Sequence, residues 1–159
     1  MASFFCDTSA IIKRYVLEIG SDFVEELACT ESKNIIILAG ITQVEVAATI
    51  ARKIKGRSVI DSDAALALAA FTHDLNNRYF MIDIEKDVLS FAMKIATKHA
   101  LRGYDAVQLA AASAANRNLT ENGEDALTFV SADSDLNSTA IAEGLSVENP
   151  NDYDFNEEL

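Results

Sequence analysis

Four acidic residues stand where they could do chemistry together. Asp7, Glu45, Asp105 and Asp133 each lie where an apolar, strand-like run ends or a helix-like pattern begins. In a parallel sheet, such residues meet in the crevice beyond the carboxyl ends of the strands. Carboxylate oxygens are the ligands that hard divalent cations prefer. The pattern predicts a metal site, and metal-dependent phosphodiester hydrolysis is the chemistry that it favours.

Each of these acids also has a structural explanation. Asp7 and Asp133 can cap helices, and the positive amino end of a helix can stabilise the negative charge of Asp105. Glu45 stands three residues after Thr42, which is the spacing of a capping box. The small polar residues that follow the first and last acids could cap the same helices without them. An unpaired carboxylate before an apolar helix is costly to bury, so we expect a shared site.

Strand-like and helix-like patterns alternate along the chain. Apolar, β-branched runs predict strands at 3–6, 35–38, 79–82, 127–130 and, at the edge of the sheet, 145–147. Helical spacing predicts helices at 10–17, 23–28, 41–55, 62–76, 84–99, 105–118 and 133–143, the first of them capped by Thr8 or Ser9. This alternation predicts an α/β fold, a three-layer α/β/α sandwich with a central, mostly parallel sheet.

Composition limits the possible functions. The 159 residues fit one domain, which we place at 1–149, followed by an acidic tail at 150–159. The net charge of −12 argues against a nucleic-acid binder that relies on a general basic surface. A nuclease stays possible, because a bound divalent cation reverses the sign of an acidic pocket.

The cysteines and the apolar runs indicate the compartment. Cys6 and Cys29 lack CxxC spacing and are expected to be free thiols in a reducing environment. No apolar stretch reaches the roughly 20 residues that a membrane span needs, and no signal-like leader is recognisable. We expect a cytoplasmic protein without a membrane partner.

Four segments around the acids resemble the successive motifs of PIN-domain proteins, specifically the VapC family of toxin ribonucleases. They are DTSAIIKRY from Asp7, TQVEVAA from Thr42, YDAVQLAA from Tyr104 and FVSADSDL from Phe129. The match runs from residue 3 to about 147, in order and with spacing like that of the family. One motif alone would be weak, whereas four in register are specific.

The resemblance implies a PIN-like parallel sheet, a Mg²⁺ or Mn²⁺ cofactor and endonucleolytic cleavage of RNA. It assigns the catalytic, metal-binding quartet to Asp7, Glu45, Asp105 and Asp133. The protein would then be the toxin of a type II toxin–antitoxin pair. The cleaved RNA would carry a 5′ phosphate and a 3′ hydroxyl.

Three accessory residues follow from the same motifs. Ser9 matches the small hydroxyl residue after the first acid, and Ser131 stands where the family often has threonine in a T-x-D motif. Asp135 is a second acid two residues after Asp133. Either of these two acids could face the metal, and the distance from the preceding strand favours Asp133.

Other polar residues are less specific. His73 and His99 lack metal-ligand spacing and are expected outside the site. Four cationic side chains could guide RNA backbone toward the pocket, although solvated helix faces explain them equally well. These are Lys13, Arg14, Arg52 and Arg102.

An apolar stripe near the amino terminus suggests association. It comprises Ile12, Tyr15, Val16, Phe23, Val24 and Leu27. Such a stripe can face its own sheet or form a partner groove. Resemblance to VapC toxins favours the groove, and implies a homodimer and an antitoxin whose Arg or Lys reaches the acidic site.

Two other functions are compatible with parts of the pattern. The first is a catalytically inactive or solitary PIN-scaffold module that binds RNA or protein, with the acids retained for the fold or for a partner. The second is an acidic phosphotransfer domain, which also places Asp after its first strand. Position 9 is Ser rather than the second Asp of a phosphatase motif, and no receiver-like Lys follows the last long strand, so this function ranks well below the others.

Overall fold

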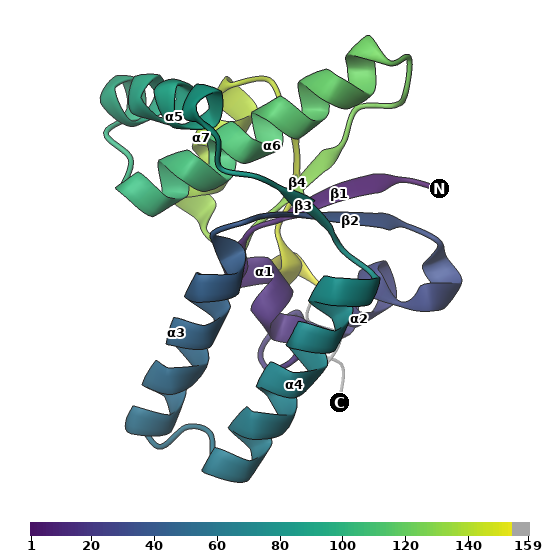
Figure 1. Ribbon diagram of the computed structural model, residues 1–159, viewed down its shortest axis with the longest axis vertical. Coiled ribbons are helices and arrows are strands. Elements are labelled where there is room, and N and C mark those ends of the chain that lie inside the picture. The colour runs from purple at the N-terminus through teal and green to yellow at the C-terminus, as the bar shows by residue number, and fades with distance from the viewer. Residues whose placement is uncertain (154–159) are drawn as a thin grey trace.

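Five parallel strands form the central sheet of the protein, for which the computed structural model describes residues 1–153 (Figure 1). The strands are β1 (Ser3–Cys6), β2 (Ile35–Ala39), β3 (Phe80–Ile82), β4 (Thr128–Val130) and β5 (Ser146–Glu148). Their order is β3-β2-β1-β4-β5, so the first strand is central and β5 lies at an edge. Every neighbouring pair is parallel, which confirms the expected sheet.

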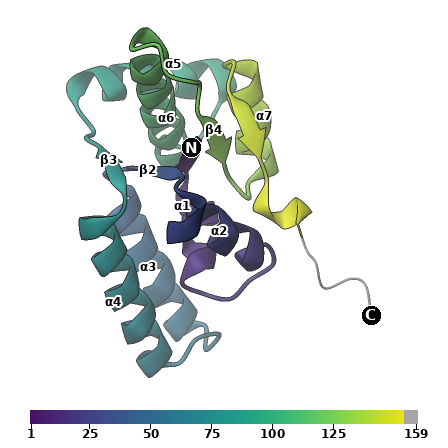
Figure 2. The ribbon, with the colours of Figure 1, turned by 90° about the vertical axis from the view of Figure 1, so that its right-hand side faces the viewer.

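Helices cover both faces of this sheet, as the three-layer prediction required (Figures 1 and 2). They are α1 (Thr8–Ile11), α2 (Ser21–Ala28), α3 (Thr42–Lys55), α4 (Asp61–Asn77), α5 (Lys86–His99), α6 (Gly103–Glu121) and α7 (Ser134–Ala142). Three short 3₁₀ helices complete the set: η1 (Ile12–Arg14), η2 (Thr30–Ser32) and η3 (Pro150–Asp152). Helices α5, α6 and α7 pack on one face, and α1 to α4 pack on the other.

The two faces of the central strand supply two separate cores. On one face Phe5 stacks on Phe129 with ring centroids 5.9 Å apart, against the buried alanines of α6. On the other face Cys6 packs with apolar residues of α1, α3 and α4. The small side chains of α6 let that helix approach the sheet closely. Both cysteines are free, and Cys6 is buried. No helix among the described residues is long and apolar enough to cross a membrane.

The first predicted helix is wrong in its length. The α-helical turn ends at Ile11 and tightens into η1, so no continuous helix reaches Leu17. The apolar stripe expected at a partner surface also belongs to the core. Ile12, Val24 and Leu27 are buried, and the stripe's aromatic members pack partly buried beside them. An amphipathic stripe facing its own sheet is the usual arrangement, and it holds here.

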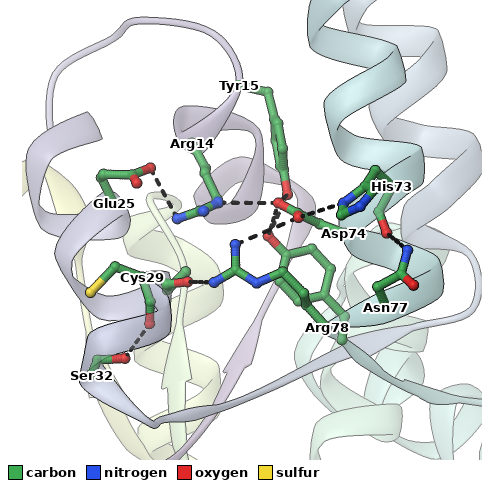
Figure 3. Close-up of polar contacts among 11 residues, drawn as sticks. Arg14, Tyr15, Glu25, Cys29, Ser32, His73, Asp74, Asn77 and Arg78 are labelled. Carbon is green, nitrogen blue, oxygen red and sulfur yellow. Dashed lines mark hydrogen bonds and ion pairs between the residues drawn. The ribbon is translucent and has the colours of Figure 1, made fainter.

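Helices α3 and α4 form a hairpin that projects from the sheet (Figures 1 and 2). A buried polar network centred on Asp74 of α4 fixes this hairpin to η1 (Figure 3). The Asp74 carboxylate accepts hydrogen bonds from the Tyr15 hydroxyl at 2.8 Å and from Arg14 Nε at 3.4 Å. Arg78 Nη1 lies 3.5 Å from it, and the Tyr79 hydroxyl contacts that of Tyr15. Desolvation raises the pKa of Asp74, but these donors and cations outweigh it and leave the pKa below its usual value.

The first residues of the expected acidic tail pack on the domain. Pro150 of η3 is buried, and the Tyr153 ring stacks on Phe23 of α2 with centroids 4.1 Å apart. Gly20 adopts a left-handed φ of 81°, and a Cβ there would collide with the Pro150 carbonyl. The rest of the predicted tail, 154–159, lies outside the described residues.

We predict that Asp74→Ala lowers the free energy of unfolding by about 3 kcal/mol, because it leaves buried cationic and hydroxyl donors without their acceptor. Urea denaturation at neutral pH measures this loss. Asp63→Ala is the matched control, since Asp63 is an exposed acid on the same helix and should cost less than about 0.5 kcal/mol. Equal losses in the two variants would contradict the role of the network.

Candidate active site

All four predicted acids line one cavity of about 350 Å³ at the carboxyl ends of the central strands. Asp7 joins β1 to α1, and Asp133 precedes α7. Glu45 lies in the first turn of α3, and Asp105 lies in the first turn of α6. Each acid therefore stands at the amino end of a helix, where the helix dipole favours negative charge. The structure thus brings together residues that are far apart in the sequence.

Asp7 is the buried centre of this site. Its Oδ1 accepts hydrogen bonds from the Ser9 hydroxyl at 2.7 Å and from the Ala10 backbone N–H at 3.0 Å. Its Oδ2 accepts from the Ser131 hydroxyl at 2.7 Å. Desolvation raises the pKa of Asp7 to about 6, although these hydrogen bonds favour the charged form. Nearby Asp105 raises it further.

Asp7 and Asp133 also cap their helices. The bond to Ala10 makes Asp7 the cap of α1, so the prediction that Thr8 or Ser9 caps this helix is wrong. Asp133 Oδ1 accepts from the backbone N–H groups of Asp135 at 3.0 Å and Leu136 at 3.1 Å. Capping and site formation are therefore two roles of the same carboxylates. The Asp135 side chain is exposed and is not among the cavity-lining residues.

Glu45 does not form the capping box that was its alternative structural explanation. Thr42 is buried within α3, and Ile41 precedes the helix without a side-chain cap. Instead, Glu45 Oε1 accepts a hydrogen bond from Gln108 Nε2 at 2.8 Å. The same amide nitrogen lies 3.0 Å from Thr42 Oγ1. The Gln108 side chain thereby orients Glu45 toward the cavity.

Sequence reasoning missed Gln108 as a site residue. It is buried on α6, three residues after Asp105 and so on the same helix face. A polar residue within an otherwise apolar helical run was the signal that could have identified it. Its buried Oε1 has no hydrogen-bond partner among the described residues, which leaves an acceptor available beside the acids.

Repulsion among the carboxylates is visible at Asp105. Desolvation raises the pKa of this half-buried residue, and the charges of Asp133 and Glu45 raise it further. Arg102 opposes them. The site concentrates negative charge that a bound cation would relieve.

The donor set fits a hard divalent cation, although it does not enclose one. Among residues 1–153, no three His, Cys, Asp or Glu side chains are placed to chelate a single ion. Magnesium usually takes only one or two carboxylates and completes its shell with water and substrate phosphate. The oxygen donors and their mutual repulsion meet that requirement. Neither histidine lines the cavity: His73 lies beside Asp74, and His99 Nε2 lies 2.6 Å from Glu143 Oε1.

Three further charged residues line the same cavity. They are Lys13 of η1, Glu18 of the following loop and Lys53 of the last turn of α3. Of the four cations considered from the sequence, only Lys13 is among the residues that line the cavity. Arg14 belongs to the Asp74 network instead. No local sequence pattern distinguishes Glu18 and Lys53 from solvated charges, so sequence reasoning missed both.

Several solved structures similar to this one are described as VapC toxins or as members of the VapBC toxin–antitoxin family. A chain of VapBC2 from Rickettsia felis, solved with a promoter DNA fragment, has a TM-score of 0.59 and 15% identity, over 92% of this chain and 98% of that one. PAE2754 from Pyrobaculum aerophilum has a TM-score of 0.62 and 15% identity, over 92% and 89%. VapC20 from Mycobacterium tuberculosis, described as a sarcin-ricin loop cleaving toxin, has a TM-score of 0.59 and 15% identity, over 89% and 95%.

These identities establish the fold alone. No protein-family model matches the chain, and no curated protein is matched by its sequence. The chain has the α/β/α, PIN-like fold of the VapC toxins. The resemblance carried by the four sequence motifs is confirmed at that level.

We predict that the unfolding free energy of the metal-free protein rises as the pH falls from about 8 toward 5. The pKa of Asp7 is raised from 3.8 to about 6, so between these values the native state binds a proton that the unfolded chain does not. The charged carboxylate therefore costs up to about 3 kcal/mol above pH 6, at about 1.4 kcal/mol per pKa unit. Asp7→Asn removes the titrating group and should flatten the dependence, measured by urea denaturation in EDTA.

The comparison variant is Asp125→Asn, which removes an exposed acid outside the cavity. It should keep the pH dependence of the wild type. An Asp7→Asn protein with an unchanged pH dependence would show that burial of this carboxylate carries no such cost.

Proposed function

We propose that the protein is a metal-dependent endoribonuclease that acts as the toxin of a type II toxin–antitoxin pair. The observation that carries the proposal is the convergence of four carboxylates, from four separate segments, on one cavity of a VapC-like fold. The neighbour described as cleaving the sarcin-ricin loop supports RNA as the substrate class. Free cysteines accord with action in the cytoplasm.

The quartet would hold Mg²⁺ or Mn²⁺ through Asp7, Glu45, Asp105 and Asp133. Such an ion lowers the pKa of a bound water and stabilises charge that develops on the phosphate. The Ser9 and Ser131 hydroxyls favour the ionised, metal-binding form of Asp7 through their hydrogen bonds.

Neighbouring groups hold two of the other acids in position. Gln108 orients Glu45, and the backbone of α7 fixes Asp133. Because Asp135 is exposed outside the cavity, we assign the metal-facing role to Asp133.

A second candidate function is a non-catalytic binding module on the same scaffold. Asp7 and Asp133 have structural roles as helix caps, and no acidic trio among residues 1–153 chelates an ion as it stands. A scaffold could retain both caps without catalysis. Glu45 and Asp105 cap nothing through their side chains, and their placement favours the nuclease.

An antitoxin and a second copy of the chain are the proposed protein partners. We place their apolar contact surface on the α3–α4 hairpin and the loop before α2, because the stripe near the amino terminus is largely buried. Leu66 of α4 is 70% exposed, Ile60 is 65% exposed and Leu17 is 89% exposed. Leu17 and Ile60 line one groove, and exposed apolar side chains of this size are typical of interaction surfaces. An antitoxin Arg or Lys would find compensating charge in the acidic cavity.

We predict that the purified protein cleaves single-stranded or loop RNA only when Mg²⁺ or Mn²⁺ is present, and that EDTA abolishes cleavage. Asp105→Asn should lower the rate by at least about a hundredfold, because it removes one of the proposed metal-binding carboxylates. Asp105 has no capping role, so the substitution should leave α6 intact. Gel analysis of RNA fragments measures the rates. Asp135→Asn is the control and should retain activity.

The thermal melting temperature supplies a second measurement on the same variants. Removing one repelling charge should leave the metal-free Asp105→Asn protein as stable as the wild type or more stable. Added Mg²⁺ should raise the melting temperature of the wild type. Full metal-dependent activity in Asp105→Asn would contradict the proposed site. If the wild type itself has no activity, the non-catalytic binding module is favoured.

We predict that the protein is a homodimer in solution and binds the product of an adjacent small gene. Leu66→Asp should weaken self-association or antitoxin binding by about tenfold or more, since it places a charge in an apolar interface. Sedimentation and co-purification measure these effects. Met93→Asp on α5 is the control, because Met93 is 73% exposed on the opposite layer. A monomer at all micromolar concentrations would reject the dimer.

A further inference from the structure

Two lysines share one carboxylate inside the acidic cavity. Lys13 Nζ lies 3.2 Å from Glu18 Oε2 and donates a hydrogen bond to the Ile19 carbonyl at 2.8 Å. Lys53 Nζ lies 2.5 Å from Glu18 Oε1. The Lys13 side chain is only 6% exposed, and that of Lys53 is 25% exposed. Lys13, Glu18 and Lys53 all line the cavity that holds the quartet.

This group carries a net positive charge. Desolvation raises the pKa of Glu18, but the hydrogen bonds from Lys53 and Lys13 outweigh it and leave the pKa below its usual value. One carboxylate thus faces two ammonium groups. Within the described part of the chain, these lysines are the only cationic residues that line the cavity.

Hydrogen-bonding capacity remains in the group. A lysine ammonium has three N–H donors, and Lys13 has two acceptors within reach, Glu18 and the Ile19 carbonyl. Lys53 has Glu18 alone among the described residues. Both lysines can therefore donate to an anion that enters the cavity.

Lys53 lies about two helical turns from Glu45 along α3. Glu45, Thr49 and Lys53 line the cavity at intervals of four residues, so they share one face of α3. Eight residues of helix span about 12 Å, which separates Lys53 from Glu45 by two turns. We therefore expect an anion bound by Lys53 to be displaced along α3 from one bound near Glu45.

The rest of the fold holds this group in place. Arg14 and Tyr15, which follow Lys13, are fixed by Asp74 in the buried network of Figure 3. Lys53 is carried by the long helix α3. A preorganised pair of cations loses little conformational freedom when it binds an anion.

We propose that Lys13 and Lys53, bridged by Glu18, form a phosphate-binding subsite for single-stranded RNA within the acidic cavity. The subsite takes a backbone phosphate that neighbours the phosphate at the quartet. It explains how a protein of net charge −12 holds a polyanion locally. The inference rests on the proposed nuclease function, and the opposing explanation is a structural tie between η1 and α3.

The test uses the Asp105→Asn background with Mg²⁺, so that a labelled single-stranded RNA of about 12 nucleotides binds without being cleaved. Lys53→Gln should weaken RNA binding about tenfold and lower the slope of log Kd against log salt by about 0.7, the value for one phosphate contact. Lys53→Arg should restore both quantities. Fluorescence anisotropy measures them across a salt series.

Lys55→Gln is the matched control, because Lys55 is an exposed lysine in the same last turn of α3 and does not line the cavity. It should change the Kd by less than about twofold. Thermal melting of every variant separates lost affinity from lost stability.

These measurements show whether the Lys13–Lys53 subsite fails by itself or together with the proposed nuclease function. If Lys53→Gln and Lys55→Gln have equal Kd values and salt slopes while the wild type cleaves RNA, the subsite is overturned and the nuclease stands. A lower melting temperature for Lys53→Gln with unchanged RNA affinity also overturns the subsite, and it supports the structural tie. A wild-type protein that neither binds nor cleaves RNA overturns both proposals.

Discussion

Burial of the Asp7 carboxylate is the constraint on which the site depends. A charge at the end of the central strand can persist there only if donors replace the water that it has lost. Those donors come from Ser9, from the backbone at Ala10 and from Ser131 at the end of β4. Satisfying this one charge therefore joins the ends of two neighbouring strands to the start of α1. The cavity forms around that junction.

The amino ends of four helices stabilise the clustered carboxylates of the site. Four carboxylates near one another repel, yet each stands at the amino end of a helix, where unpaired N–H groups and the dipole offset negative charge. Capping at Asp7 and Asp133 is part of this compensation rather than an alternative to a functional site. Desolvation, followed by the charges of Asp133 and Glu45, still raises the pKa of Asp105.

Local positive charge in the cavity can attract the proposed polyanionic substrate, although the protein as a whole is acidic. Glu18 pairs with two lysines that line the cavity of the quartet, so cationic side chains share this space with the acids. An overall charge of −12 describes the surface and says little about this arrangement. Screening by salt confines such effects to about a Debye length, on the order of 10 Å.

Local patterns in the chain were enough to predict the layers, the parallel strands and the meeting of the four acids in one cavity, because these depend on apolar periodicity and on motifs placed after strands. Ser9 and Ser131 were predicted from the motifs as accessory residues, and both contact Asp7, whereas other neighbours of the acids became known only from the folded chain. Gln108 orients Glu45 across two helices, and Lys53 meets Lys13 through Glu18. The early end of α1 likewise follows from packing, since Tyr15 turns inward to reach Asp74 on α4. Contacts between segments far apart in the chain leave no local pattern, and for that reason sequence reasoning could not have placed them.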